Sequence, residues 1–266
     1  MESDGPMIPV VLAGASGRTG RVVGQGIVAA DDMALMGVLG QRTAEQAISY
    51  VWGEAAEIDL TILAAVEEIS TARAVLVDFT DAESAVPRIL IALERGWDLV
   101  VGTTGFTVRQ LDMFAGLVRE ARVGAAFIPN FSLGAWALEQ MAALASQHCA
   151  TAEIIESHAP GKKDRPSGTS KRVAAILAEQ WGMPLDRIPV HSIRLDGMVA
   201  HQMIVFGGAG QVITIRHDVH DRTAYVPGVL AAIRAVRHAR GSLLTSLGEV
   251  WPVASAAEAA PRRPLS

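Results

Sequence analysis

A continuous apolar segment that runs directly into a glycine-rich turn is the feature that most constrains the fold of this chain. Residues 8–13 read Ile-Pro-Val-Val-Leu-Ala and lack the alternation of a half-exposed strand. Such a run is typical of a strand buried on both faces of a parallel sheet. Glycines follow at positions 14, 17 and 20, and helical spacing covers residues 18–30. The segment therefore predicts the first βα unit of a doubly wound sheet.

The alternation of strand and helix patterns continues as far as residue 128 and then changes. We predict an α/β fold, with an N-terminal Rossmann-type doubly wound parallel sheet in residues 1–130 and a C-terminal α+β domain with an open mixed sheet in residues 131–224. A C-terminal helix at 225–250 is expected to pack back on the first domain, and residues 254–266 to form a disordered tail. The strand patterns at 188–195, 201–206 and 211–217 are expected to form an antiparallel set, because Gly207, Gly208 and nearby turn residues separate the last two strands at hairpin spacing. The other expected strands cover 33–39, 74–77, 98–101, 125–128 and 152–157, and the other expected helices cover 82–94, 108–122, 135–146 and 168–181.

Composition and charge limit the protein classes to be considered. The 266 residues are 50% hydrophobic and 19% charged, which is enough apolar material for the core of a soluble globular protein. A net charge of -5 argues against a nucleic-acid binder, and no segment is apolar enough to span a membrane. The N-terminus lacks a basic and apolar leader, so a cytoplasmic location is expected. Cys149 is the single cysteine, and the histidines at 201, 217 and 220 have no partners at metal-ligand spacing, so we expect no metal.

The turn after the first strand is predicted to bind the phosphates of a dinucleotide. Glycine at 14 permits a tight turn, glycine at 17 lets the backbone approach a pyrophosphate, and a helix start offers unpaired N–H donors. The alternative is a plain strand-to-helix turn, because the spacing GxxGxxG differs from the usual dinucleotide fingerprint. The predicted cofactor-binding residues of this turn are Gly14, Ala15, Ser16, Gly17, Arg18 and Thr19.

The end of the second expected strand bears on the choice of cofactor. A site that prefers NADH usually ends this strand with a carboxylate for the ribose hydroxyls, but here the chain reads Gly40-Gln41-Arg42. Arg42 and Arg18 suit a 2′-phosphate, because a guanidinium matches phosphate geometry. The alternative is that both arginines are solvated. We expect NADPH or NADH as the cofactor, with NADPH at least as good.

Two more loops follow strands of the expected parallel sheet and are predicted to contact the cofactor. The carboxyl ends of parallel strands meet at the edge where dinucleotides bind. Small and hydroxyl-bearing residues there allow backbone contact with the ribose and nicotinamide, although Asp78 has the alternative role of capping the helix near Ala82. The residues predicted for this part of the site are Phe79, Thr80, Gly102, Thr103 and Thr104.

Residues 156–169 form the segment richest in chemically active side chains. His158 titrates near neutrality and Lys162 supplies a positive charge. Ser167, Gly168 and Thr169 resemble a helix start whose hydroxyl and N–H groups can hold a carboxylate. A lone histidine or lysine is usually structural, but this combination favours a site for a small anionic substrate.

The same segment resembles the substrate loop of the dihydrodipicolinate reductase family, which reads approximately E-x-H-H-x-x-K-x-D-x-P-S-G-T. The resemblance extends to residues 14–20, 77–80, 102–105, 129–134, 199–202 and 216–222. It implies hydride transfer from NADPH or NADH to C4 of a cyclic unsaturated dicarboxylate, with loss of water, in lysine and diaminopimelate synthesis. It also implies a Rossmann domain, a substrate-binding domain that forms a homotetramer, and hinge closure between the domains. By position it assigns His158 as the acid/base, Lys162 as the residue that protonates or holds the substrate, Ser167, Gly168 and Thr169 as the carboxylate cradle, and Pro129, Asn130 and Phe131 to the cofactor site.

The substrate loop departs from the family pattern at four positions. Ala159 replaces the second histidine, Pro160 and Gly161 precede the lysine, and Arg165 precedes Pro166. Losing one charge-assisted hydrogen bond to a carboxylate costs about 1.5 to 3 kcal/mol, or roughly ten- to hundredfold in affinity. Two alternatives therefore stay open beside the family reaction: a paralogous reductase that acts on another imine, enamine or unsaturated acid, and a sensor that binds NAD(P)H without turnover.

Overall fold

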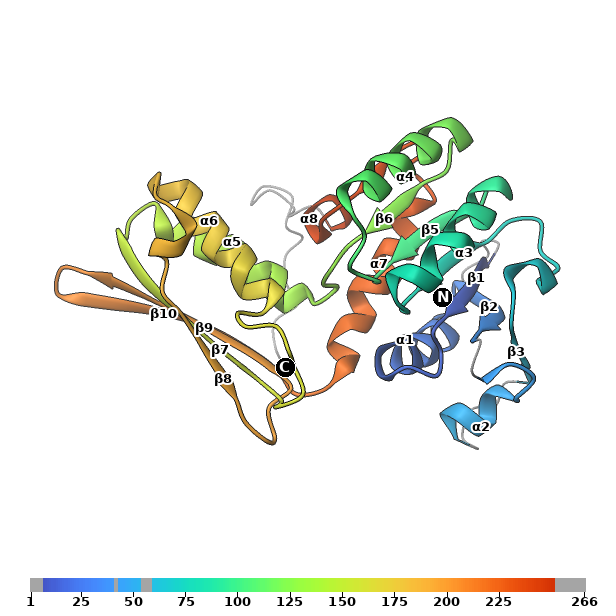
Figure 1. Ribbon diagram of the computed structural model, residues 1–266, viewed down its shortest axis with the longest axis horizontal. Coiled ribbons are helices and arrows are strands. Elements are labelled where there is room, and N and C mark those ends of the chain that lie inside the picture. The colour runs from blue at the N-terminus through green and yellow to red at the C-terminus, as the bar shows by residue number, and fades with distance from the viewer. Residues whose placement is uncertain (1–6, 41–42, 54–58, 252–266) are drawn as a thin grey trace, which may run out of the picture. The chain divides into compact units, whose positions relative to one another are not determined.

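The computed structural model of the protein describes residues 7–40, 43–53 and 59–251 (Figure 1). These residues form two compact units. The first contains the described residues up to Pro129 and from Gly228 onward, and the second is Asn130–Pro227. No helix in the described ranges is long and apolar enough to cross a membrane.

The first unit is a parallel sheet covered by helices, as the apolar strand and glycine turn predicted. Its described strands lie in the order β11-β6-β5-β4-β1-β2-β3, and every pairing between them is parallel. The side chains of Val10, Val11 and Leu12 are fully buried, because helices cover both faces of β1. The chain runs outward from β1 in opposite directions, to β2 and to β4, so the loops after β1 and β4 meet at a topological switch point. The strands are β1 (Ile8–Ala13), β2 (Met33–Leu39), β3 (Ile62–Leu63), β4 (Val75–Asp78), β5 (Asp98–Val101), β6 (Ala125–Phe127) and β11 (Leu243–Leu244), and the helices are α1 (Arg18–Val28), α2 (Ile48–Trp52), α3 (Ala82–Glu94), α4 (Val108–Ala121), α7 (Val226–Val236) and α8 (Leu247–Val250), with a 3₁₀ turn η2 (Val66–Glu68).

The C-terminal part of the chain is not the single helix expected at 225–250. A 3₁₀ turn, η4 (Arg222–Tyr225), leads into α7, and then the chain turns into the short strand β11 and the short helix α8. Gly241 makes the turn with a φ of +71°, and its N–H donates to the carbonyl of Val123 at 2.8 Å. This turn aligns β11 with the edge strand β6, so the end of the chain extends the sheet of the first unit.

Asp98 holds this returning segment from inside the sheet. Its carboxylate is fully buried and accepts hydrogen bonds from the N–H of Gly124 at 2.9 Å and from Arg237 at 2.8 Å. Arg240 adds a longer contact of 3.4 Å. A buried carboxylate with these donors fixes the junction of β5, β6 and α7.

The second unit is a mixed sheet with helices on one face. Its strand order is β10-β9-β7-β8, and Figure 1 shows α5 and α6 against one side of the sheet. Ile154, Ile204 and Phe206 are fully buried in one apolar cluster with side chains of α5 and α6. The opposite face of the sheet has no covering element in the described part of this unit. The strands are β7 (Thr151–His158), β8 (Val190–Arg194), β9 (Ala200–Gly208) and β10 (Gln211–Val219), and the helices are α5 (Leu133–Ser146) and α6 (Gly168–Trp181), with a 3₁₀ turn η3 (Leu185–Arg187).

Two details of the expected antiparallel set are wrong. β8 does not pair with β9, but lies parallel to β7 at the sheet edge. The reason is that α6 connects β7 to β8, and a helical crossover returns the chain in the same direction. The hairpin between β9 and β10 turns at Ala209 and Gly210, where Gly210 has a φ of +69°, whereas Gly207 and Gly208 lie within β9.

The role of Asp98 predicts a difference between two ion pairs of the first unit. Asp98→Ala would leave the buried N–H of Gly124 without its acceptor, so we expect the free energy of unfolding to fall by about 2 kcal/mol. Asp32→Ala is the matched control, because Asp32 makes two hydrogen bonds of 2.8 Å to Arg234 near the surface. An exposed pair contributes less than about 1 kcal/mol. Denaturant melts of the two variants check the difference, and equal losses would contradict the role of Asp98.

Candidate functional site

The glycine turn after β1 has a backbone that side chains would block. Gly14 has a φ of +88°, and a Cβ there would lie 2.7 Å from the carbonyl oxygen of Phe79. A Cβ on Gly20 would lie only 2.0 Å from the carbonyl oxygen of Gly14, so α1 packs directly against the turn. Gly17 is the N-cap of α1, and no side chain caps the helix. The first amides of α1 are therefore left for water or for a bound anion such as a phosphate.

Trp52 supports the glycine turn, and no local sequence pattern identifies it. Its indole Nε1 donates to the carbonyl of Ala15 at 3.0 Å, in a buried position. A Cβ on Gly24 would lie 2.3 Å from the indole ring, so glycine at 24 makes room for it on α1. Arg21 donates to the carbonyl of Trp52 at 2.7 Å. The short helix α2 thus fixes both the turn and the first part of α1.

The loops after β4 and β5 are joined through the buried carboxylate of Asp78. Its Oδ1 accepts from the hydroxyl of Thr80 at 2.6 Å and from the hydroxyl of Thr103 at 2.7 Å. Its Oδ2 accepts from Nε of Arg88 at 3.0 Å. Both threonine hydroxyls therefore already donate within the protein, so a cofactor would meet the backbone of these loops first. The capping alternative for Asp78 is wrong, because Asp81 caps α3 by accepting from the N–H of Ser84 at 2.9 Å.

Phe79 brings the loops after β1, β4 and β5 into one cluster. A Cβ on Gly102 would lie 2.2 Å from the Phe79 ring, and the Phe79 carbonyl lies against Gly14. The first unit thus assembles most of the predicted cofactor residues at the carboxyl ends of adjacent strands, with Pro129 after β6. Asn130 and Phe131 belong to the second unit, and Arg42 lies outside the described residues. The members of this cluster and of the glycine turn that are exposed to solvent are Ser16, Gly17, Arg18 and Thr104.

His158 ends β7 and is held by a fully buried carboxylate. Its Nδ1 is hydrogen-bonded to Glu156, which lies two residues earlier on the same face of the strand. Arg194 of β8 binds both oxygens of Glu156, each at 2.9 Å, and its side chain is only 2% exposed. Arg194 was not predicted as a site residue. The sequence around it carries no signal for this role, because its partner Glu156 lies 38 residues away in the chain.

The surroundings of Glu156 and His158 lower the pKa of both groups. Burial opposes ionisation of Glu156, but hydrogen bonds from Arg194, Ser192 and His158 outweigh it and lower the pKa of its carboxyl. Burial also lowers the pKa of His158, with further lowering from the charges of Lys162 and Arg194, although Glu156 opposes this shift. We therefore expect an ionised Glu156 beside a largely neutral His158 at neutral pH, with Nε2 left to exchange a proton.

Lys162 lies on the exposed loop that follows β7. Its Nζ is 2.9 Å from Oδ1 of Asp164, and the N–H of Lys162 donates to the carbonyl of Ala159 at 3.1 Å in a tight turn. The hydrogen bond from the Lys162 side chain to Asp164 lowers the pKa of the Asp164 carboxyl. The side chains of Lys162 and Asp164 are 30% and 47% exposed, so the ion pair is open to solvent and Lys162 can exchange Asp164 for an anionic ligand.

The start of α6 offers two backbone amides and the hydroxyl of Thr169, whereas the hydroxyl of Ser167 caps the helix. Ser167 caps the helix, because its Oγ accepts from the N–H of Ser170 at 3.2 Å. The Oγ of Thr169 accepts from the side-chain amide of Asn130 at 3.2 Å. The Oγ of Ser167 is thus held by Ser170, whereas the O–H of Thr169 and the N–H groups of Gly168 and Thr169 are left to donate to water or a carboxylate. Asn130, predicted for the cofactor, thus lies beside the predicted substrate residues.

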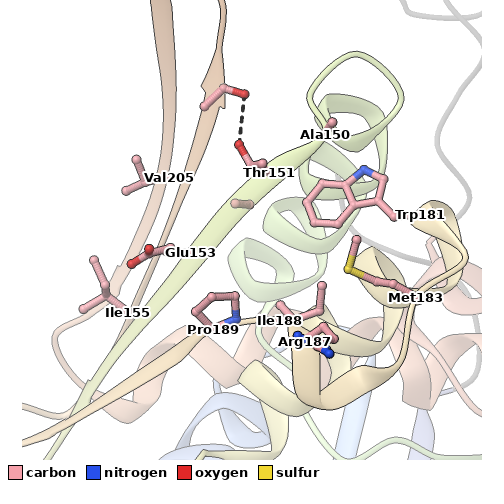
Figure 2. Close-up of a pocket in the computed structure, with 12 residues that line it drawn as sticks. Ala150, Thr151, Glu153, Ile155, Trp181, Met183, Arg187, Ile188, Pro189 and Val205 are labelled. Atoms are coloured by element: carbon pink, nitrogen blue, oxygen red, sulfur yellow. Dashed lines mark hydrogen bonds between the residues drawn. The ribbon is translucent and has the colours of Figure 1, made fainter.

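A separate cavity lies at the other end of the second sheet. It has a volume of about 550 Å³ and lies at the start of β7, near Thr151, Trp181 and Met183 (Figure 2). His158 lies seven residue steps along β7 from Thr151, which is roughly 23 Å at 3.3 Å per residue. None of the predicted site residues that the structure describes lines this cavity.

Comparisons with known proteins match nearly the whole described chain to one family. A family profile described as dihydrodipicolinate reductase, N-terminus, matches residues 8–131, and one described as dihydrodipicolinate reductase, C-terminus, matches residues 133–250. A 4-hydroxy-tetrahydrodipicolinate reductase of Moorella thermoacetica is 40% identical, over 88% of this chain and 94% of its own. One from Enterococcus faecalis is 36% identical, over 86% of this chain and 95% of its own. The solved structure of a dipicolinate-bound dihydrodipicolinate reductase from Paenisporosarcina sp. TG-14 has a TM-score of 0.78 and 30% identity, and covers 92% of this chain and 100% of that one.

The packing of the glycine turn predicts the effect of one added methyl group. Gly20→Ala has to displace the turn, because its Cβ would overlap the carbonyl oxygen of Gly14. We expect NADPH to bind at least about tenfold more weakly, which corresponds to roughly 1.4 kcal/mol. Gly116→Ala on α4 is the matched control, since a Cβ there meets no atom within 4 Å. Fluorescence titration with NADPH checks both variants, and unchanged binding by Gly20→Ala would contradict the placement of the cofactor phosphates at this turn.

Proposed function

The chain belongs to the dihydrodipicolinate reductase family, and we propose that it is an NADPH- or NADH-dependent reductase that acts on 4-hydroxy-tetrahydrodipicolinate in lysine and diaminopimelate synthesis. The observation that carries the proposal is the arrangement at the end of β7 and the start of α6. One short segment of the second unit carries three kinds of group: His158, which is hydrogen-bonded to Glu156; Lys162; and two unpaired backbone amides at the start of α6. This set combines a proton-transfer group with binding groups for an anion.

The first unit fits the dinucleotide. The glycine turn is free of side chains where a pyrophosphate would approach, and the uncapped start of α1 provides N–H donors. The nicotinamide supplies the hydride when the cofactor is bound. The exposed Arg18 is a candidate partner for a 2′-phosphate, which supports NADPH as at least as good a cofactor as NADH.

The second unit fits a small dicarboxylate. The amides of Gly168 and Thr169 bind one carboxylate, and Lys162 supplies a positive charge and a proton donor beside it. His158 exchanges a proton at Nε2 while Glu156 holds its Nδ1. Negative charge that develops on the substrate as the hydride arrives is therefore stabilised by hydrogen-bond donors that are already in place.

Ala159 leaves this pocket without the donor that the family pattern places there. Lys163 and Arg165 are exposed on the same loop and carry positive charges close to the missing position in the sequence. Either of them can replace the lost interaction as a flexible cation, with less geometric control than a histidine on the strand end. We therefore expect a higher Michaelis constant for the dicarboxylate than a family member with both histidines would have.

The test is oxidation of NADPH, followed at 340 nm, with substrate formed in place by dihydrodipicolinate synthase. We expect turnover with this substrate in preference to a panel of cyclic imines and unsaturated acids. Turnover only with a member of the panel would contradict the proposal and identify a paralogous reductase. Tight NADPH binding without oxidation by any of them would contradict it as well and identify a sensor.

We also propose that the chain is a homotetramer that works in the cytoplasm, where its reductant is available. The face of the second sheet opposite α5 and α6 carries apolar side chains, among them Ile155, Met203 and Val205, and a second copy would cover them. We expect light scattering to give four times the chain mass, and Met203→Glu to give a smaller species. Val108→Glu on the exposed start of α4 is the control. A monomeric wild-type chain would contradict this assembly.

A further inference from the structure

The side chain of Arg194 is buried, and all five of its N–H donors form hydrogen bonds within the protein. Nη1 donates to Oε2 of Glu156 at 2.9 Å and to the carbonyl of Ile193 at 2.7 Å. Nη2 donates to Oε1 of Glu156 at 2.9 Å and to the carbonyl of Asp164 at 2.6 Å. Nε donates to the carbonyl of Lys162 at 3.2 Å. A guanidinium has five such donors in a rigid fork, so its position is determined completely by these contacts.

The contacts of Arg194 reach both of the side chains that act on the substrate. One edge of the guanidinium holds Glu156, and Glu156 holds Nδ1 of His158. The other contacts hold two backbone carbonyls of the loop that carries Lys162. The strand register places Arg194 directly beside His158, so one side chain connects the strand end to the loop.

Stability alone does not account for this arrangement. Side chains of Arg194 and Glu156 are 2% and 0% exposed, and removing two charges from water costs free energy that their attraction repays only with good geometry. A well-packed apolar pair of similar volume is often as stable as a buried ion pair. An ionised Glu156 is useful, however, because it fixes the proton of His158 on Nδ1 and supports a charged ring during proton transfer.

We propose that Arg194 is a positioning residue that holds His158, through Glu156, and the Lys162 loop in one arrangement for the reaction. The inference rests on the reductase function proposed above. It predicts that Arg194 acts on turnover and on the proton equilibrium of His158 rather than on cofactor binding. The charged groups that face His158 are Glu156 on β7, Arg194 on β8 and Lys162 on the loop.

Two substitutions should move the pKa of His158 in opposite directions. Arg194→Met removes a positive charge and leaves His158 as the remaining partner of a buried carboxylate, so the pKa of His158 should rise. Glu156→Gln removes the carboxylate charge that raises the pKa of His158 against the effect of burial, so the pKa of His158 should fall further. Titration of the His158 ring by NMR measures both shifts. If Arg194 only stabilised the fold and did not act on His158, folded Arg194→Met would leave the pKa of His158 at its wild-type value.

The kinetic readout separates charge from geometry. We expect kcat of Arg194→Met to fall on the order of 100-fold, toward that of His158→Ala, with the Michaelis constant for NADPH unchanged. Arg194→Lys restores the charge but has three donors in place of five, so it should return the pKa of His158 toward its wild-type value without restoring kcat. This variant and Glu156→Gln keep the proposal testable if Arg194→Met does not fold.

Arg172→Met is the matched control. It also removes an arginine from an ion pair of the second unit, because Arg172 donates to Glu139 at 2.8 Å between α6 and α5. It should keep the wild-type kcat and the wild-type pKa of His158, and thermal melts show whether each variant is folded.

The proposal is overturned if folded Arg194→Met retains the kcat of Arg172→Met, or if the pKa of His158 is the same in wild type, Arg194→Met and Glu156→Gln. A wild-type protein without reductase activity would refute the proposed function, whereas the titration of His158 would still test the positioning by Arg194. The two failures are therefore distinguishable.

Discussion

The carboxylate of Glu156 lies buried in β7 with Arg194 on one side and His158 on the other. The geometry of the second unit's site depends on this interaction. Arg194 keeps the carboxylate ionised, the carboxylate fixes the ring of His158, and the same arginine holds the loop that carries Lys162. The Glu156–Arg194 ion pair contacts both His158 at the strand end and the loop that carries Lys162, so it fixes the position of one relative to the other.

The first unit uses buried carboxylates in a similar way. Asp78 occupies the hydroxyls of Thr80 and Thr103 and thereby leaves backbone as the surface that a cofactor meets. Asp98 binds the segment that returns from the C-terminal part of the chain. In each case a carboxylate inside the sheet orders loops at its edge, because an unpaired buried charge would be costly. The glycines at 14 and 102 then allow the loops to approach one another.

The sequence predicted those parts of the structure whose patterns are local. The apolar run of β1, the glycine turn and the alternation up to β6 were sufficient for the parallel sheet, and the family profiles confirm the resemblance. The orientation of β8 was wrong because pairing depends on the α6 crossover rather than on strand spacing. The C-terminal helix forms as α7, but its expected extension to residue 250 was wrong, because the chain turns at Gly241 into β11. Trp52 and Arg194 could not be identified from local patterns, since their partners lie more than thirty residues away in the chain.

The most direct measurement is a crystal structure of the protein with NADPH and dipicolinate bound. In the second unit, we expect a carboxylate of dipicolinate on the amides of Gly168 and Thr169, with Nε2 of His158 facing the ring. Lys162 should have left Asp164 for the ligand, while both oxygens of Glu156 stay on Arg194. A structure in which His158 has turned away from Glu156, or in which dipicolinate binds without contact to this segment, would contradict the account.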